Sequence, residues 1–209
     1  MHTAIDRPAE VRRGMRLEYI TLSYNLVEAV VSLVAGLVAG SIALIGFGVD
    51  AVIESISGSI MLWRLHSDGG AHRERIEKRA LRLIGASFLL LAAYVAYESA
   101  EKLITREAPD RSIPGIVIAC CSLIVMPVLA RKKRAVGRNL HSAAMVADSR
   151  QTQLCSYLSA ILLGGLLLNA AAGWWWADPV AGLIMTPIIA REGIAGLRGE
   201  GCGCGSACH

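Results

Sequence analysis

Six long apolar segments constrain the fold of this chain more than any other feature of its sequence. Each is long enough to cross a bilayer, which takes about 20 predominantly apolar residues in a helix. Hydrophobic residues make up 54% of the 209 residues, and soluble domains of this size do not carry repeated apolar runs of such length. The sequence therefore predicts an all-α, polytopic membrane protein with six transmembrane helices. The segments cover roughly residues 18–39, 41–63, 80–104, 112–130, 142–171 and 176–196.

Basic residues concentrate in alternate connections between these segments. They precede the first segment, separate the second from the third and the fourth from the fifth, and follow the sixth. Because Lys and Arg are enriched in cytoplasmic loops, both termini are predicted to lie in the cytoplasm, in a plasma membrane of bacterial type. Topology thus accounts for the net charge of +4, and we expect no nucleic-acid partner. The expected parts are a cytoplasmic segment (1–17), a six-helix transmembrane domain (18–196) and a Gly/Cys-rich cytoplasmic tail (197–209).

Two carboxylates, Asp50 and Glu54, lie one helical turn apart inside the second apolar segment. Ionised side chains at such a depth cost several kcal/mol and are rare unless they line a polar pathway. The neighbouring segments offer no evident basic partner. We therefore interpret the pair as part of a binding site for a cation.

Polar residues also follow one face of the first and fifth segments, because residues three or four positions apart share a helix face. Interhelical hydrogen bonds explain Asn25, Ser32 and Thr152 without any ligand. Asn25 is alternatively part of a polar pathway, together with Glu28 and Asp148. The two stripes are Thr21, Asn25, Glu28 and Ser32 in the first segment, and Asp148, Gln151, Thr152 and Cys155 in the fifth.

The second and fifth segments bring their polar residues to similar depths. At 1.5 Å per residue, Asp50 lies about 14 Å from the outer end of its segment and Cys155 about 20 Å from the inner end of its own. Because the segments are antiparallel, Asp50 can face Cys155 and Glu54 can face Gln151. Two carboxylates, a thiolate and an amide oxygen suit a divalent metal of the zinc type. The sequence predicts a metal site at these four residues.

The end of the chain holds a second candidate for metal binding. Its cysteine thiolates and histidine imidazole can bind zinc, cadmium or copper(I). The spacing of these residues fits no standard zinc finger. The alternative to metal capture is therefore a tail that is dispensable. The residues concerned in this tail are Cys202, Cys204, Cys208 and His209.

No nucleophile–base pair, P-loop or HExxH segment is present, so we expect no enzyme.

Taken in order, the motifs of this chain resemble the cation diffusion facilitator family of divalent metal exporters. The family builds its transport site from an acidic pair in the second helix and a His-x-x-x-Asp pair in the fifth. Asp50 and Glu54 match the acidic pair, with Glu in place of the second Asp. Gln151 and Cys155 stand at the His and Asp positions. The similar stretches reach to about residue 196 and are YNLVEAVVSLVAG, IALIGFGVDAVIES, YVAYESAEKL, AMVADSRQTQLCSYLSA and WWWADPVAGL.

This resemblance implies a secondary transporter that exports a zinc-type divalent cation from the cytoplasm by antiport against protons. The metal is then a substrate, and no resident cofactor is expected. The resemblance also implies a homodimer in the lipid bilayer, and a short form without the cytoplasmic C-terminal domain that is common in the family. Loss of the His removes the obvious proton-exchanging group near neutral pH. The altered pair and the absent domain give some weight to the alternative, a non-transporting membrane protein that senses or buffers metal or regulates a partner.

Overall fold

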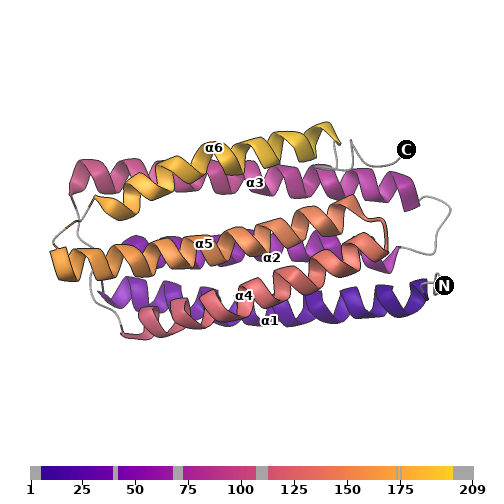
Figure 1. The fold of residues 1–209 in the computed structure, drawn as a ribbon, viewed down its shortest axis with the longest axis horizontal. Helices are drawn as coiled ribbons and strands as arrows, with labels where there is room; N and C mark the ends of the chain where they lie inside the picture. The colour runs from indigo at the N-terminus through magenta and orange to yellow at the C-terminus, as the bar shows by residue number, and fades with distance from the viewer. Residues whose placement is uncertain are drawn as a thin grey trace.

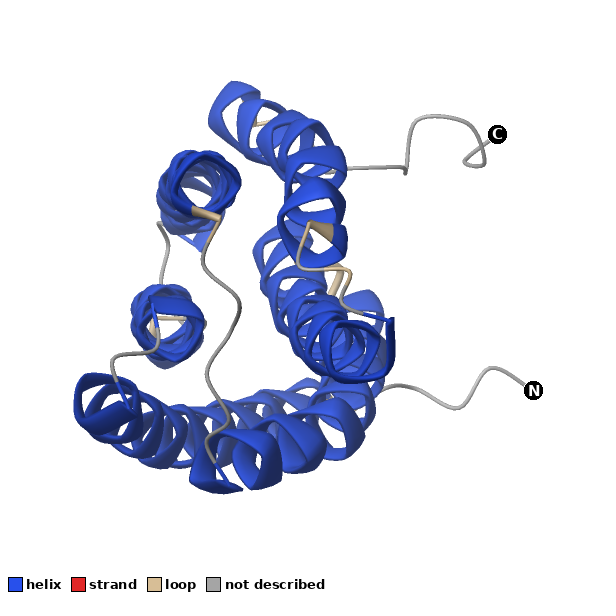
Figure 2. Ribbon diagram, turned by 90° about the vertical axis from the view of Figure 1, so that its left-hand side faces the viewer, coloured by secondary structure: helices blue, strands red, loops and turns tan. Residues whose placement is uncertain are grey.

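The computed structural model of the chain is a bundle of long helices. It describes residues 6–39, 42–67, 73–106, 113–172, 174 and 176–199. No strand occurs in these residues (Figure 2), so the predicted all-α fold is confirmed. The helices, shown in Figure 1, are α1 (Arg7–Ala39), α2 (Ile42–His66), α3 (Arg73–Thr105), α4 (Ile113–Asn139), α5 (Ala143–Ala172) and α6 (Ala177–Arg198).

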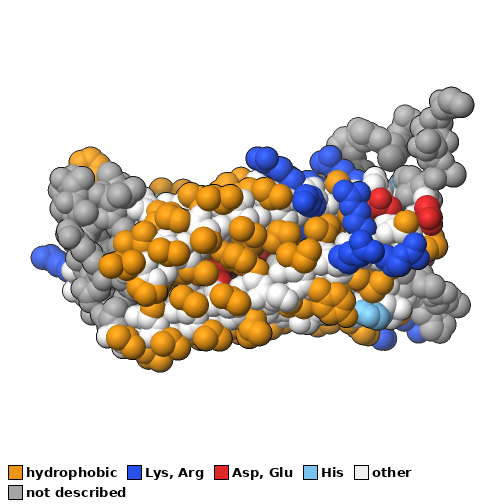
Figure 3. Space-filling model, turned by 90° about the horizontal axis from the view of Figure 1, so that it is seen from below, with side chains coloured by type: hydrophobic (Ala, Val, Ile, Leu, Met, Phe, Trp, Pro, Cys, Tyr) orange, Lys and Arg blue, Asp and Glu red, His pale blue; other side chains and the backbone are white. Residues whose placement is uncertain are grey.

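The surface of the bundle is that of an integral membrane protein. Four helices, α1 to α4, are apolar and long enough to cross a membrane over their described residues. The 30 residues of α5 and the 22 of α6 reach about as far, at 1.5 Å per residue. Large apolar side chains such as Leu26, Leu37 and Ile124 are exposed, which a soluble surface avoids. Figure 3 shows hydrophobic side chains along the bundle, with Lys and Arg gathered mostly at one end.

We call the end that holds the start of α1 and the last turn of α6 the basic end, and the other end the opposite end (Figure 1). The helices pack as three close pairs, α1 with α2, α4 with α5, and α3 with α6. Further contacts join these pairs. Helix α1 contacts α4, α2 contacts both α3 and α5, and α5 contacts both α3 and α6. The helices that carry Asp50 and Cys155 therefore meet at the centre of the bundle.

Glycines allow α3 and α6 to touch backbone to backbone. A Cβ atom added at Gly85 would lie 2.7–2.8 Å from backbone atoms of Gly193, Gly196 and Leu197. A Cβ atom at Gly196 would in turn lie 2.8 Å from the Cα atom of Gly85. Small residues at such crossings are typical of membrane helices, whose association depends on close packing.

We expect Gly85→Ala to destabilise the protein, because its methyl group meets backbone atoms that cannot turn away as a side chain would. Overpacking of this kind costs about 1–3 kcal/mol. Gly164→Ala is the matched control, since a Cβ atom there meets nothing within 4 Å. Thermal unfolding in detergent should give a lower Tm for Gly85→Ala alone. Equal Tm values for both variants would contradict the close crossing.

Candidate cation site

Three acidic side chains are buried together where α1 packs against α2. Glu28 on α1 is 0% exposed, and Asp50 and Glu54 on α2 are 3% and 1% exposed. The three carboxyl groups lie close enough to interact electrostatically with one another. Carboxylates of like charge repel strongly in a dry interior, and burying them uncompensated is costly. This acidic cluster therefore favours a bound cation.

Most oxygens of the acidic cluster have no hydrogen-bond partner within the described part of the chain. They are Oε2 of Glu28, Oδ2 of Asp50 and both Oε atoms of Glu54. Asn25 lies one turn before Glu28 on α1, and both of its side-chain polar atoms also lack a hydrogen-bond partner within the described residues. Because buried polar atoms are nearly always satisfied in native proteins, such groups point to a missing ion or ligand.

Cys155 on α5 adds a sulfur atom to the acidic cluster. Its thiol donates a hydrogen bond to Oε1 of Glu28 (Sγ–Oε1 3.6 Å), and its Sγ lies 3.9 Å from Oγ of Ser122 on α4. The thiol also interacts electrostatically with Asp50 and Glu54. Hard carboxylate oxygens with one soft sulfur form a donor set that suits divalent transition metals.

The donors are neighbours, but they do not form a closed coordination shell. Among the side chains that the structure describes, no three His, Cys, Asp or Glu groups are placed to hold a metal ion as they stand. Glu28 and Glu54 have three side-chain torsions each, and they come from helices that pack directly together. Closing these donors around a cation would take a rotation of the two carboxylates toward Cys155.

Gln151 has a different neighbour from the one expected. Its Oε1 accepts a hydrogen bond from the hydroxyl of Ser87 on α3 (3.1 Å). Glu54, which the sequence placed opposite Gln151, interacts instead with Thr152 and Cys155. Glu28, assigned from the sequence only to a polar pathway, is the acid that contacts Cys155. The geometry therefore favours Glu28 as the fourth donor, and a direct role for Gln151 stays a prediction.

Asp148 belongs to a separate ion-pair network nearer the basic end. The Nζ atom of Lys133 on α4 lies 2.8 Å from Oδ2 of Asp148 and 2.7 Å from Oε2 of Glu18 on α1, and all three side chains are 0% exposed. Ser57 on α2 donates a hydrogen bond to Oδ1 of Asp148 (2.8 Å). This Lys133 network ties α1, α2, α4 and α5 together.

The role of Lys133 was not expected from the sequence, because the basic run at 131–134 was assigned to the connection between the fourth and fifth segments. In the structure α4 continues to Asn139, so Lys133 lies inside a helix. Lys133 also interacts electrostatically with Glu54, which corrects the expectation that the acidic pair has no basic neighbour. A signal was present, since Met126, Leu129 and Val136 continue the buried helical face on either side of the lysine.

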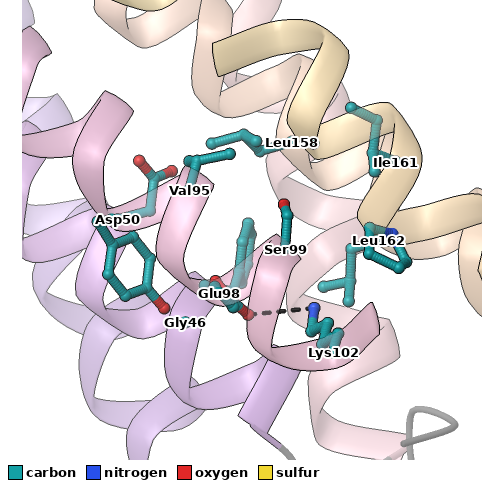
Figure 4. A pocket seen from close by; sticks show the side chains of 13 residues that line it. Gly46, Asp50, Val95, Glu98, Ser99, Lys102, Leu158, Ile161 and Leu162 are labelled. Carbon is teal, nitrogen blue, oxygen red and sulfur yellow. Dashed lines mark ion pairs between the residues drawn. The ribbon is translucent and has the colours of Figure 1, made fainter. Parts of the chain in front are cut away.

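A cavity of about 60 Å³ reaches Asp50 from the opposite half of the bundle. It lies between α2, α3, α5 and α6, and its walls include Gly46, Tyr94 and Ser99. Figure 4 shows that Glu98 and Lys102, both on α3, form an ion pair in it, with Nζ and Oε1 3.1 Å apart. The acidic cluster thus has a cavity on one side and the Lys133 network on the other.

The predicted tail ligands Cys202, Cys204, Cys208 and His209 lie outside the described residues.

Comparison with known proteins places this bundle in a family. Residues 19–198 match the cation efflux transmembrane domain. Transmembrane protein 163 of Xenopus laevis is 24% identical over 186 residues, which are 88% of this chain and 66% of that protein. An uncharacterized transporter of Methanocaldococcus jannaschii is 27% identical over 175 residues, 80% of this chain and 61% of the relative.

The magnetosome protein MamB of Paramagnetospirillum magneticum is 26% identical over 170 residues, 77% of this chain and 56% of MamB. The chain thus spans between 56% and 66% of the length of these three relatives. The domain match covers most of the chain, from Tyr19 to Arg198. It includes every residue of the acidic cluster, and every residue of the Lys133 network except Glu18. The chain therefore belongs to the cation efflux family, the cation diffusion facilitators that its motifs resemble.

Proposed function

We propose that this protein is a secondary transporter that exports a divalent transition metal of the zinc type in exchange for protons. The observation that carries the proposal is the acidic cluster with Cys155 at the centre of a membrane-embedded bundle. Most of the buried carboxylate oxygens there have no hydrogen-bond partner among the described residues. Membership of the cation efflux family supports a cation as substrate. The donor chemistry supports a metal of intermediate softness.

The two sides of the acidic cluster support alternating access. In this structure the Lys133 network joins four helices on the side of the basic end, and the cavity approaches Asp50 from the other side. Rocking of helix pairs that breaks the network opens the cluster toward the basic end. The positive-inside rule assigns that end to the cytoplasm. The cation then enters from the cytoplasm and leaves through the cavity.

Protons reset the acidic cluster after the cation has left. Three carboxyl groups this close together in a dry bundle repel one another when all are charged. A departing divalent cation is therefore replaced by protons, which keep the cluster near neutrality. Exchange of metal for protons follows from the same acids that bind the metal.

Flux into proteoliposomes tests the proposal. We expect Zn²⁺ uptake, read with a zinc-sensitive dye inside the vesicles, to depend on a pH gradient that drives protons out of them. Asp50→Asn keeps the side-chain shape but removes a charge, and it should lower the flux by at least about 100-fold. The reason is that mutation of residues that only hydrogen-bond to metal ligands already lowers metal affinity by about 10–100-fold.

Glu74→Gln is the matched control, because it makes the same acid-to-amide change at a side chain that is 84% exposed. It should transport like the unaltered protein. Equal flux in Asp50→Asn and the unaltered protein would contradict the site. Zn²⁺ binding without flux under any gradient would favour the metal-sensing alternative instead.

A further inference from the structure

The cavity beside Asp50 contains a second acid that the transport site does not use. Glu98 lies one turn from Lys102 on α3, and their side chains are 14% and 13% exposed. Both lie within a helix that crosses the membrane. A nearly buried ion pair in such a place is costly and marks an ion pathway more often than a structural link.

The surroundings of Glu98 supply further oxygen atoms. The Tyr94 hydroxyl hydrogen-bonds to Glu98, and Ser99 lines the same cavity. Gly46 gives the carboxylate its room, because an added Cβ atom there would overlap the Glu98 carboxylate and the Tyr94 hydroxyl. Carboxylate and hydroxyl oxygens around a small space are the ligands that divalent cations take from proteins.

The cavity also connects Glu98 with the transport site. Asp50 lines it, is 3% exposed and leaves its Oδ2 atom without a partner in the described structure. Asp50 and Glu98 interact electrostatically through this space. An unpartnered buried oxygen in the same cavity as a second acid is the arrangement that passes a cation from one group to the next.

We propose that Glu98, with the Tyr94 and Ser99 hydroxyls, is a second divalent-cation station, and that the Lys102 ammonium occupies it as a tethered counter-ion. The proposal rests on the proposed transport function. A cation that leaves Asp50 displaces Lys102 from Glu98, and Lys102 returns when the cation has gone. The lysine thereby prevents Glu98 from trapping metal on its way out.

Replacing Lys102 tests this station. Lys102→Met removes the charge but keeps most of the chain length, so the Glu98 carboxylate should lose its ammonium counter-ion and take up metal in its place. In equilibrium dialysis of the full chain with Zn²⁺, we expect Lys102→Met to bind one equivalent more than the unaltered protein. With Co²⁺, the added equivalent should show no thiolate charge-transfer band, because the station has only oxygen ligands. Zn²⁺ added on the opposite-end side should also inhibit flux at about 10-fold lower concentration.

Two further variants separate the station from a general charge effect. Lys102→Met combined with Glu98→Gln should lose the added equivalent. Lys102→Met combined with Gly46→Ala should lose it as well, although every acid remains, because the methyl group displaces the Glu98 carboxylate. Lys132→Met, an exposed lysine on α4, is the control and should bind as the unaltered protein does.

The outcomes distinguish this proposal from the proposed function. Absence of flux in the unaltered protein would overturn transport itself. Normal flux in the unaltered protein, with neither an added equivalent nor stronger inhibition in Lys102→Met, would overturn the station alone. An added equivalent that survives Glu98→Gln would also overturn it, because the metal would then be bound elsewhere.

Discussion

Replacement of Lys133 by Met is expected to lower the free energy of unfolding by about 3–5 kcal/mol, the usual effect of breaking a buried ion pair from one side. The substitution leaves Glu18 and Asp148 facing each other in the interior, where each now lies within 3 Å of the ammonium. Denaturation in mixed detergent micelles measures the change. Lys132→Met removes the same charge from the exposed neighbouring position and should change stability by less than about 0.5 kcal/mol.

A compensated variant shows whether the stability comes from the charges or from packing. Lys133→Met combined with Glu18→Gln and Asp148→Asn removes all three charges and keeps the side-chain volumes. Neutral replacements of a complete buried network are often tolerated, so most of the lost stability should return. If Lys133→Met alone is as stable as the unaltered protein, the three groups do not form the network that the structure shows.

The number and the helical character of the membrane segments could be predicted from the sequence, because the cost of exposing backbone polar groups to lipid leaves few alternatives. The buried face of α1 could be predicted as well. Thr21, Asn25 and Glu28 follow helical spacing, and all three are fully buried. In a membrane bundle polar side chains avoid lipid, so a polar stripe marks the interior as reliably as an apolar stripe does in a soluble protein.

The ends of the helices could not be predicted in the same way. The apolar segment expected at 112–130 belongs to a helix that continues to Asn139, and α1 begins at Arg7 rather than near residue 18. Hydropathy marks where lipid contact ends, whereas helices continue beyond it when they pack against each other. Lys133 lies in such an extension, which is why its role was missed.

Matching depths along the helices predicted that Cys155 lies near the acids, but the rotation of a helix about its axis cannot be read from the sequence. Cys155 does interact electrostatically with Glu28, Asp50 and Glu54. Gln151, one turn away, contacts Ser87 on α3 instead. Because α5 contacts four other helices, residues on one face of it can have different neighbours. Only packing decides that Glu28 rather than Gln151 contacts the thiol.

Replacement of Cys155 by Ser is expected to change metal preference more than any other change at the site. The thiol places a soft donor beside three carboxylates, and soft ligands favour Cd²⁺ and Zn²⁺ over the hard ion Mn²⁺. We expect the ratio of Cd²⁺ to Mn²⁺ flux in proteoliposomes to fall by about 10–100-fold, the range seen when metal-site groups are altered. Cys121→Ser, at an exposed cysteine of α4, should leave the ratio unchanged. An unchanged ratio in Cys155→Ser would remove the thiol from the ligand set and leave the carboxylates alone to select the ion.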